Sequence, residues 1–141
     1  MFSFVYNRSG MFDALSKYKN NGHFFFEPTD ALDEECIAPA DQDGIYIIYE
    51  LKKGRPRMVY IGSSRGGLKD SIKNGAPGEP EPRKRSLPVK MLSENIDVLD
   101  IYWYITNNGN VNDHPEEIKN QFLSMYREVY GELPKWNKHW Q

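Results

Sequence analysis

The chain has 141 residues, of which 39% are hydrophobic and 13% are aromatic, and its net charge at pH 7 is −2. This length fits one domain of ordinary size, and the apolar content excludes disorder of the whole chain. The longest apolar runs are far too short to cross a bilayer, and the first ten residues lack the pattern of a secretory signal. The single cysteine, Cys36, excludes an internal disulfide. We therefore expect a cytoplasmic protein with no membrane partner.

Residues 1–43 are predicted to form an N-terminal extension that packs on the domain after it. Apolar residues at helical spacing predict a short helix over 12–21, and the aromatic run at 23–27 predicts a short strand. Segment 28–44 is acidic and contains two prolines, which is typical of a loop with a single helical turn.

A β-hairpin is predicted next, because segments 44–50 and 58–62 are both rich in β-branched and aromatic residues. Segment 51–57 is interpreted as the turn between the two strands. A helix is predicted over 67–75, where an Asn-Gly pair signals its end.

Segment 76–82 contains three prolines, which exclude regular structure there. A helix is then predicted over 86–94, starting near Pro88. Residues 98–106 alternate between two faces, which predicts a third strand whose Trp103 lies in the core.

A turn-rich loop is expected over 107–113, followed by a long helix. Asp113 is interpreted as the N-cap of this helix, with Glu116 as its capping-box partner. The apolar stripe and the stop signal of the helix are Ile118, Phe122, Met125, Val129 and Gly131. The C-terminal tail over 135–141 is expected to pack partly back on the core, with Trp136 and Trp140 as the candidates for a surface role.

Together these elements predict an α+β fold. We expect a small, mainly antiparallel three-stranded sheet flanked by helices, with a helix and a strand in the extension over 1–43 and the domain itself over 44–141.

Positive charge is concentrated in one part of the chain. Residues 51–91 hold eleven basic and three acidic residues, a net charge of +8, so the other 100 residues carry −10. A basic segment on an acidic body is typical of a protein that binds a polyanion, although a solvated basic loop has the same composition. The candidate nucleic-acid contacts are Arg65, Lys69, Lys73, Arg83, Lys84 and Arg85.

Two tripeptides lie on the predicted hairpin. Gly44-Ile45-Tyr46 begins its first strand, Tyr60-Ile61-Gly62 ends its second, and Pro134-Lys135-Trp136-Asn137 follows the last helix. With a helix and then a strand after the second tripeptide, this pattern resembles the GIY-YIG nuclease superfamily over residues 44–137. The resemblance implies metal-dependent hydrolysis of phosphodiesters, with nucleic acid, DNA above all, as the partner and Mg²⁺ or Mn²⁺ as the cofactor of an active enzyme.

Three kinds of side chain carry the chemistry that this resemblance implies. A tyrosine from one of the tripeptides helps to activate water, an arginine on the helix after YIG stabilises charge on the phosphate, and a glutamate on the late helix holds the metal. The residue types suit these tasks, because a guanidinium forks onto phosphate and a carboxylate binds a hard cation.

The chain matches these positions unevenly. The matched positions are Tyr46, Tyr60 and the closing Asn137. Ser71 falls at the position of the arginine and Lys119 at that of the glutamate. A serine has no guanidinium with which to bind phosphate, and a lysine repels a metal ion. The sequence therefore leaves open whether the chain is an enzyme. Glu116, one helical turn before Lys119, is the alternative metal ligand.

Simpler interpretations exist for each of these residues. Tyrosines are common in half-buried strands, Glu116 has its capping role, and Lys119 is interpreted as a solvated residue at the edge of the helix stripe. Three functions therefore stay open: a metal-dependent endonuclease, a nucleic-acid-binding module that has lost catalysis, and a protein–protein interaction domain of the same fold. Oligomeric state is not readable from the sequence.

Overall fold

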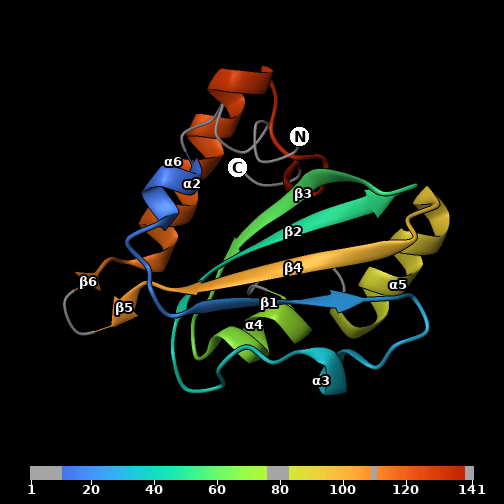
Figure 1. Ribbon diagram of the computed structural model, residues 1–141, viewed down its shortest axis with the longest axis horizontal. Coiled ribbons are helices and arrows are strands. Elements are labelled where there is room, and N and C mark those ends of the chain that lie inside the picture. Colours follow the sequence, from blue (N-terminus) through green and yellow to red (C-terminus); the bar gives the residue numbers. More distant parts are fainter. Residues whose placement is uncertain (1–10, 76–82, 109–110, 139–141) are drawn as a thin grey trace.

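The computed structural model describes residues 11–75, 83–108 and 111–138. They form an α+β fold in which a four-stranded antiparallel sheet is flanked by helices (Figure 1). The strands are β1 (Asn21–Phe26), β2 (Gly44–Lys52), β3 (Arg55–Ser63) and β4 (Val98–Ile105), with a separate short pair of β5 (Asn107–Asn108) and β6 (Val111–Asn112). The helices are α2 (Met11–Leu15), α3 (Leu32–Glu35), α4 (Leu68–Asn74), α5 (Arg83–Glu94), α6 (Pro115–Tyr130) and the 3-10 helix η1 (Lys135–Asn137).

The main sheet has one strand more than the three predicted. Its order is β1-β4-β2-β3, and every neighbouring pair is antiparallel. The additional strand, β1, comes from the extension and pairs with β4 from Asn21 opposite Tyr104 to Phe26 opposite Leu99. The predicted number of three strands in the sheet is therefore corrected to four. By joining the sheet, the aromatic strand β1 gains cross-strand contacts and buries one of its faces. The extension therefore contributes to the same sheet as the predicted domain.

The predicted hairpin of β2 and β3 is confirmed, with longer strands than expected. The strands reach Lys52 and restart at Arg55, so the turn is only Lys53-Gly54. Both turn residues have positive φ, 52° and 77°, as a two-residue type I′ turn requires. The predicted turn over 51–57 is wrong because charged residues at an exposed hairpin end still belong to the strands.

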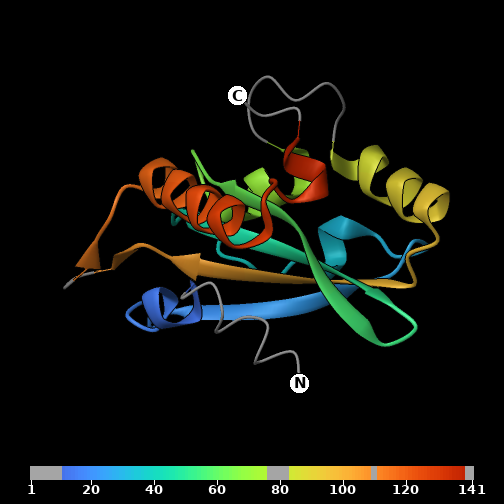
Figure 2. The ribbon, with the colours of Figure 1, turned by 90° about the horizontal axis from the view of Figure 1, so that it is seen from above.

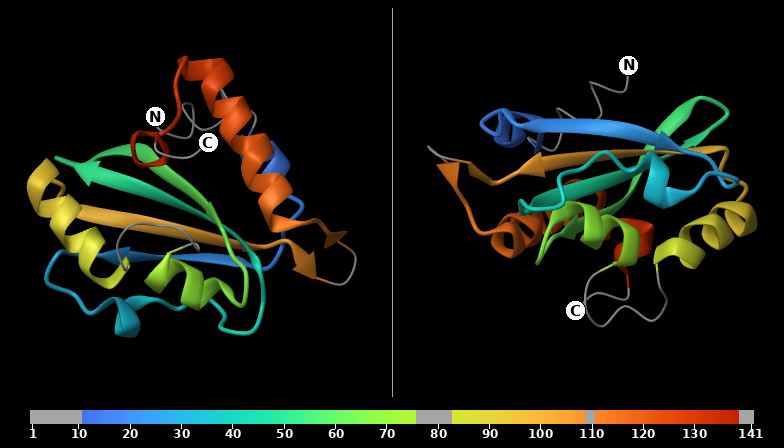
Figure 3. Two further views of the ribbon diagram at one scale, coloured as in Figure 1. Left: turned by 180° about the vertical axis from the view of Figure 1, so that it is seen from behind. Right: turned by 90° about the horizontal axis from the view of Figure 1, so that it is seen from below.

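Helices pack against both faces of the sheet. One core contains Ile48 and Trp103 with residues of α4 and α5, and the other contains Ile47 and Tyr104 with residues of α2 and α6. Figure 2 shows α4 and α5 on one side of the sheet and α2 on the other, and Figure 3 shows α4 and α5 from their own side. The alternation predicted for β4 is confirmed, and Trp103 is a core residue with 8% of its surface exposed.

Two predicted helices have different limits. α2 ends at Leu15 rather than near residue 21, because the backbone N–H and the hydroxyl of Ser16 both bond to the carbonyl of Asp13. α5 begins at Arg83, so Pro88 lies inside it and removes one helical hydrogen bond. Burial of the neighbouring core side chains offsets this loss: Leu87 and Met91 are both 0% exposed.

The start of α6 also differs from the prediction. Asp113 does not cap the helix; its carboxylate accepts a hydrogen bond from the Tyr18 hydroxyl at 2.6 Å and pairs with Lys17 at 2.9 Å. His114 takes the N-cap position without a side-chain cap, and Pro115 begins the helix. The buried side of α6 is formed by Ile118, Lys119, Phe122, Leu123 and Tyr126. Val129, predicted in the stripe, is 41% exposed.

No helix in the described ranges is long and apolar enough to span a bilayer.

Candidate functional site at the GIY-YIG hairpin

The two tripeptides face each other across the hairpin, and their tyrosines share one face of the sheet. Tyr46 lies directly opposite Gly62, and a Cβ atom at residue 62 would lie 2.4 Å from Cζ of Tyr46. The glycine is therefore required by the ring that crosses it. The rings of Tyr46 and Tyr60 are tilted, with centroids 5.8 Å apart, and both are buried in the α4–α5 core. The structure brings together the two tyrosines that the resemblance singles out.

Ser71 is also brought to this place. It lies on α4, and its carbonyl accepts a hydrogen bond of 3.4 Å from the hydroxyl of Tyr46. Its own hydroxyl accepts one of 3.3 Å from the backbone N–H of Arg65. The position at which the resemblance predicts an arginine thus holds a buried neutral side chain, which bonds to the loop between β3 and α4.

Two polar residues that sequence reasoning missed hold the start of the hairpin. The backbone N–H of Gly44 donates to Oγ of Ser64 at 2.8 Å, and Ser64 in turn donates to Oδ1 of Asp43 at 2.9 Å. The same Asp43 oxygen accepts from the backbone N–H of Gly67 at 2.8 Å. The hairpin register already indicates this pairing, because extending Ile45 opposite Ser63 by one residue places Gly44 beside Ser64.

The side-chain amide of Asn137 makes two hydrogen bonds with the backbone of the second tripeptide. The N–H of Ile61 donates to Oδ1 of Asn137 at 2.9 Å, and Nδ2 of Asn137 donates to the carbonyl of Ile61 at 3.0 Å. β3 is an edge strand, so the amide side chain occupies the place of a further strand at this point. Asn137 is 2% exposed, which makes it a residue that positions Tyr60 and Gly62.

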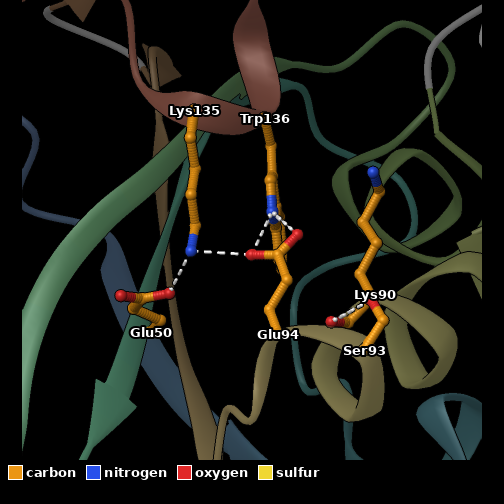
Figure 4. A network of polar contacts seen from close by, with 6 residues as sticks. All are labelled: Glu50, Lys90, Ser93, Glu94, Lys135 and Trp136. Carbon is orange, nitrogen blue, oxygen red and sulfur yellow. Dashed lines mark hydrogen bonds and ion pairs between the residues drawn. The ribbon is translucent and has the colours of Figure 1, made fainter.

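The rest of the closing motif is anchored to β2 and α5 (Figure 4). Nζ of Lys135 lies 2.7 Å from Oε1 of Glu50 and 2.7 Å from Oε1 of Glu94. The indole N–H of Trp136 donates to Glu94 at 3.1 Å, and Nζ of Lys90 lies 5.5 Å from the centre of that ring. Trp136 is 5% exposed, so its predicted surface role is wrong: the ring is buried, and its polar atom has a partly buried partner in Glu94. Trp140 lies outside the described residues.

These contacts shift the ionisation of Glu94 and Lys135. Burial raises the pKa of the Glu94 carboxyl, but hydrogen bonds from Lys135 and Trp136 outweigh it and hold the pKa below its usual value. Burial lowers the pKa of Lys135, and the bonds to Glu50 and Glu94 outweigh this too, so its pKa is raised. The group is an internal ion pair that joins η1 to the sheet.

Arg65, Glu116 and Lys119 meet where the loop after β3 approaches the first turns of α6. Oε1 of Glu116 lies 3.8 Å from Arg65, and Oε2 lies 3.7 Å from Nζ of Lys119. Lys119 is 8% exposed, so it is not the solvated residue expected at the edge of the stripe. The helix turns it inward, next to Ile118. The side chains of Arg65 and Glu116 are 79% and 48% exposed.

The surroundings of Glu116 do not match a divalent-metal site. Such a site needs several oxygen ligands, whereas the two ion-pair partners of Glu116 are cations. Within residues 11–75, 83–108 and 111–138, no three His, Cys, Asp or Glu side chains are placed to hold a metal ion. The position at which the resemblance predicts a glutamate holds the cation of Lys119.

In the part of the basic segment whose side chains the structure describes, the cations are spread over both ends of the hairpin. The Lys52–Arg57 end of the hairpin and the Arg65 end are separated by strands of nine residues, which span about 26 Å from first to last Cα at roughly 3.3 Å per residue. Near the tyrosines, Arg65 is well exposed and Lys69 is half-buried. Lys73 pairs with Asp33 at 2.8 Å, which raises the pKa of its ammonium. The side chains of Arg83, Lys84 and Arg85 lie outside the described part of the chain.

Comparison with known protein families found no family model that matches this chain. Comparison with curated proteins and with solved structures found no match either.

Proposed function

We propose that this chain is a GIY-YIG-like domain that binds the phosphate backbone of nucleic acid, DNA above all, and does not cleave it. The observation that supports this most directly is the continuous series of contacts from Tyr46 through Ser71 and Arg65 to Glu116 and Lys119. It joins Tyr46 to the positions at which the resemblance predicts an arginine and a glutamate, and its charged members are two cations and one carboxylate.

Arg65 is the side chain best placed to contact a phosphate. Its guanidinium is 79% exposed, and its pairing with Glu116 at 3.8 Å is long and largely solvated. Exposed ion pairs of this kind contribute little free energy, typically about 0–1 kcal/mol. A phosphate that receives two parallel N–H bonds from the guanidinium therefore displaces this contact at small cost.

Hydrolysis is disfavoured by the same geometry. Tyr46 is 0% exposed, and its hydroxyl donates to the Ser71 carbonyl, so it is poorly placed to reach a water molecule. Ser71 supplies no positive charge to a pentacovalent phosphate, and loss of one such donor typically costs on the order of 10²–10³ in rate. Lys119 places a cation where the nuclease would need an anionic metal ligand.

Binding of a fluorescent 20-base-pair DNA duplex, followed by anisotropy between 50 and 200 mM salt, tests this proposal. We expect affinity to fall steeply with salt. Arg65→Ala should weaken binding about two- to tenfold and reduce the salt slope by about one unit. Arg55→Ala is the matched control, because it removes an exposed arginine at the far end of the hairpin and should change binding less.

The same samples are incubated with supercoiled plasmid and Mg²⁺ or Mn²⁺, with EDTA as the control, and we expect no nicking. Metal-dependent nicking that disappears in Tyr46→Phe would show an active endonuclease and refute the loss of catalysis. Equal effects of the two arginine variants would move the binding site away from the tripeptides. Absence of any DNA binding would favour the protein–protein interaction domain.

A further inference from the structure

A second surface with specific chemistry lies on β1 and β4, on the opposite side of the sheet from Tyr46 and Tyr60. The ring of His23 stacks on that of Tyr102, with centroids 4.6 Å apart and planes 10° from parallel. Phe25, two residues further along β1, meets His23 edge-on at 5.5 Å. Phe25 is 53% exposed and the His23 side chain 43% exposed, so the cluster presents aromatic surface to solvent.

Asp100 places a carboxylate among these rings. It lies opposite Phe25 in the β1–β4 register, and its Oδ1 is 2.7 Å from Nδ1 of His23. Only 14% of its side chain is exposed, and burial raises the pKa of its carboxyl despite the bond from His23. In the described ranges this is its single side-chain hydrogen bond, so its second oxygen is left to accept another. We call His23, Phe25, Asp100 and Tyr102 the β1–β4 aromatic surface.

The charge of the neighbouring chain decides which ligand fits. β1 contains neither lysine nor arginine, and the carboxylates carried by β4 and by the residue after β1 are those of Asp100 and Glu27. Glu27 follows β1 directly and is exposed. Phosphate groups are repelled by such a field, whereas a cation is attracted.

We propose that the β1–β4 aromatic surface binds an arginine side chain of a partner polypeptide. A guanidinium is a flat cation that stacks on an exposed ring and at the same time donates hydrogen bonds to a carboxylate. Phe25 and Asp100 offer these two contacts side by side. A lysine ammonium has the charge but neither the plane nor the fork, so the site discriminates between the two. This inference stands independently of the nucleic-acid function proposed for the opposite side.

The test uses fluorescein-labelled peptides Gly-Ser-Arg-Gly-Arg-Ser-Gly and Gly-Ser-Lys-Gly-Lys-Ser-Gly with the full chain, measured by anisotropy. We expect the arginine peptide to bind at least fivefold more tightly than the lysine peptide. Asp100→Asn should weaken arginine binding about tenfold or more, because it removes a charge-assisted hydrogen bond. Phe25→Leu, which keeps an apolar side chain but removes the ring, should weaken it about two- to fivefold.

Glu34→Gln is the matched control, because it removes an exposed acid of α3, which packs on the opposite side of the sheet, and it should change binding less than twofold. Equal affinities for the two peptides, or equal effects of Asp100→Asn and Glu34→Gln, would overturn the proposal in favour of general attraction between charges. Absence of binding would overturn it as well. A single-stranded oligonucleotide of mixed sequence is the third probe: if it binds and Phe25→Leu weakens that binding, the surface stacks bases instead. Should Asp100→Asn fail to fold, the exposed Phe25→Leu variant and the peptide comparison still decide the question.

Discussion

Replacement of Asn137 by alanine should destabilise the protein strongly, although it removes only one small side chain. The amide makes two buried hydrogen bonds, of 2.9 and 3.0 Å, with the N–H and the carbonyl of Ile61. Alanine leaves both backbone groups unsatisfied, at a cost of about 1–3 kcal/mol each. We therefore expect the free energy of unfolding to fall by roughly 2–6 kcal/mol, a large part of the 5–15 kcal/mol that is typical of a domain.

Urea denaturation followed by tryptophan fluorescence measures this change. With a slope of about 2 kcal/mol per molar urea, the midpoint should fall by roughly 1–3 M. Lys138→Ala is the neighbouring control, because Lys138 pairs with Glu132 on the surface, where both side chains are more than half exposed. It should change the free energy of unfolding by less than about 1 kcal/mol.

The variant Asn137→Asp gives a sharper result at the same position. Its ionised carboxylate would still accept from the N–H of Ile61 but would repel the carbonyl of that residue, whereas the protonated form donates to the carbonyl. Burial and the carbonyl both raise the folded-state pKa of the introduced carboxyl, so the variant should recover stability relative to the wild type as the pH falls from 7 to 5. An Asn137→Ala midpoint equal to that of Lys138→Ala would refute the argument that this amide clamps the edge of β3.

Two further predictions concern the hairpin and the ion pairs of the closing motif. Gly62→Ala should lower the free energy of unfolding by about 1–3 kcal/mol, because its Cβ would lie 2.4 Å from Cζ of Tyr46. A double-mutant cycle with Tyr46→Leu, measured by urea denaturation, should show a coupling energy of roughly 0.5–3 kcal/mol. Additive effects of the two substitutions would contradict the contact. The lowered pKa of Glu94 means that its contribution to stability is present above the ordinary value of 4.5 and is lost as the pH falls through the folded-state value. The stability difference between the wild type and Glu94→Gln should therefore shrink in acid, as measured by urea denaturation from pH 7 to pH 3, and a constant difference would contradict the ion-pair account.

The hairpin and its two tyrosines were predictable because the information is local. Strand composition indicates β2 and β3, and their antiparallel register alone places Tyr46 beside Gly62. The alternation of β4 likewise separates Trp103 from Tyr102 before any contact is known. The limits of these elements were less accurate, as at Pro88, because core packing outweighs the local cost of a proline.

The features that were missed depend on contacts distant in sequence. Asp113 has the composition of an N-cap, but Tyr18 and Lys17, about 95 residues earlier, take its carboxylate. A lysine such as Lys119 is expected in solvent, because lysine side chains are mostly exposed. Its burial depends on how α6 packs against β2 and β3, which its own sequence segment does not indicate. The aromatic surface of β1 and β4 was not predicted, because nothing in the segment 23–27 indicates which strand it joins.

The position of β1 has a consequence for how the protein folds. His23 and Asp100 are 77 residues apart, so β1 is made first and acquires its neighbour only after β4 has been synthesised. The hairpin of β2 and β3, closed by a two-residue turn, needs no such wait. Because long-range pairing is slow, we expect the hairpin to form early and β1 to join late. Until then, one edge of β4 has no partner strand, and the aromatic residues of β1 are not yet packed on the sheet. The folding chain is therefore exposed to pairing of this edge with a strand of another molecule.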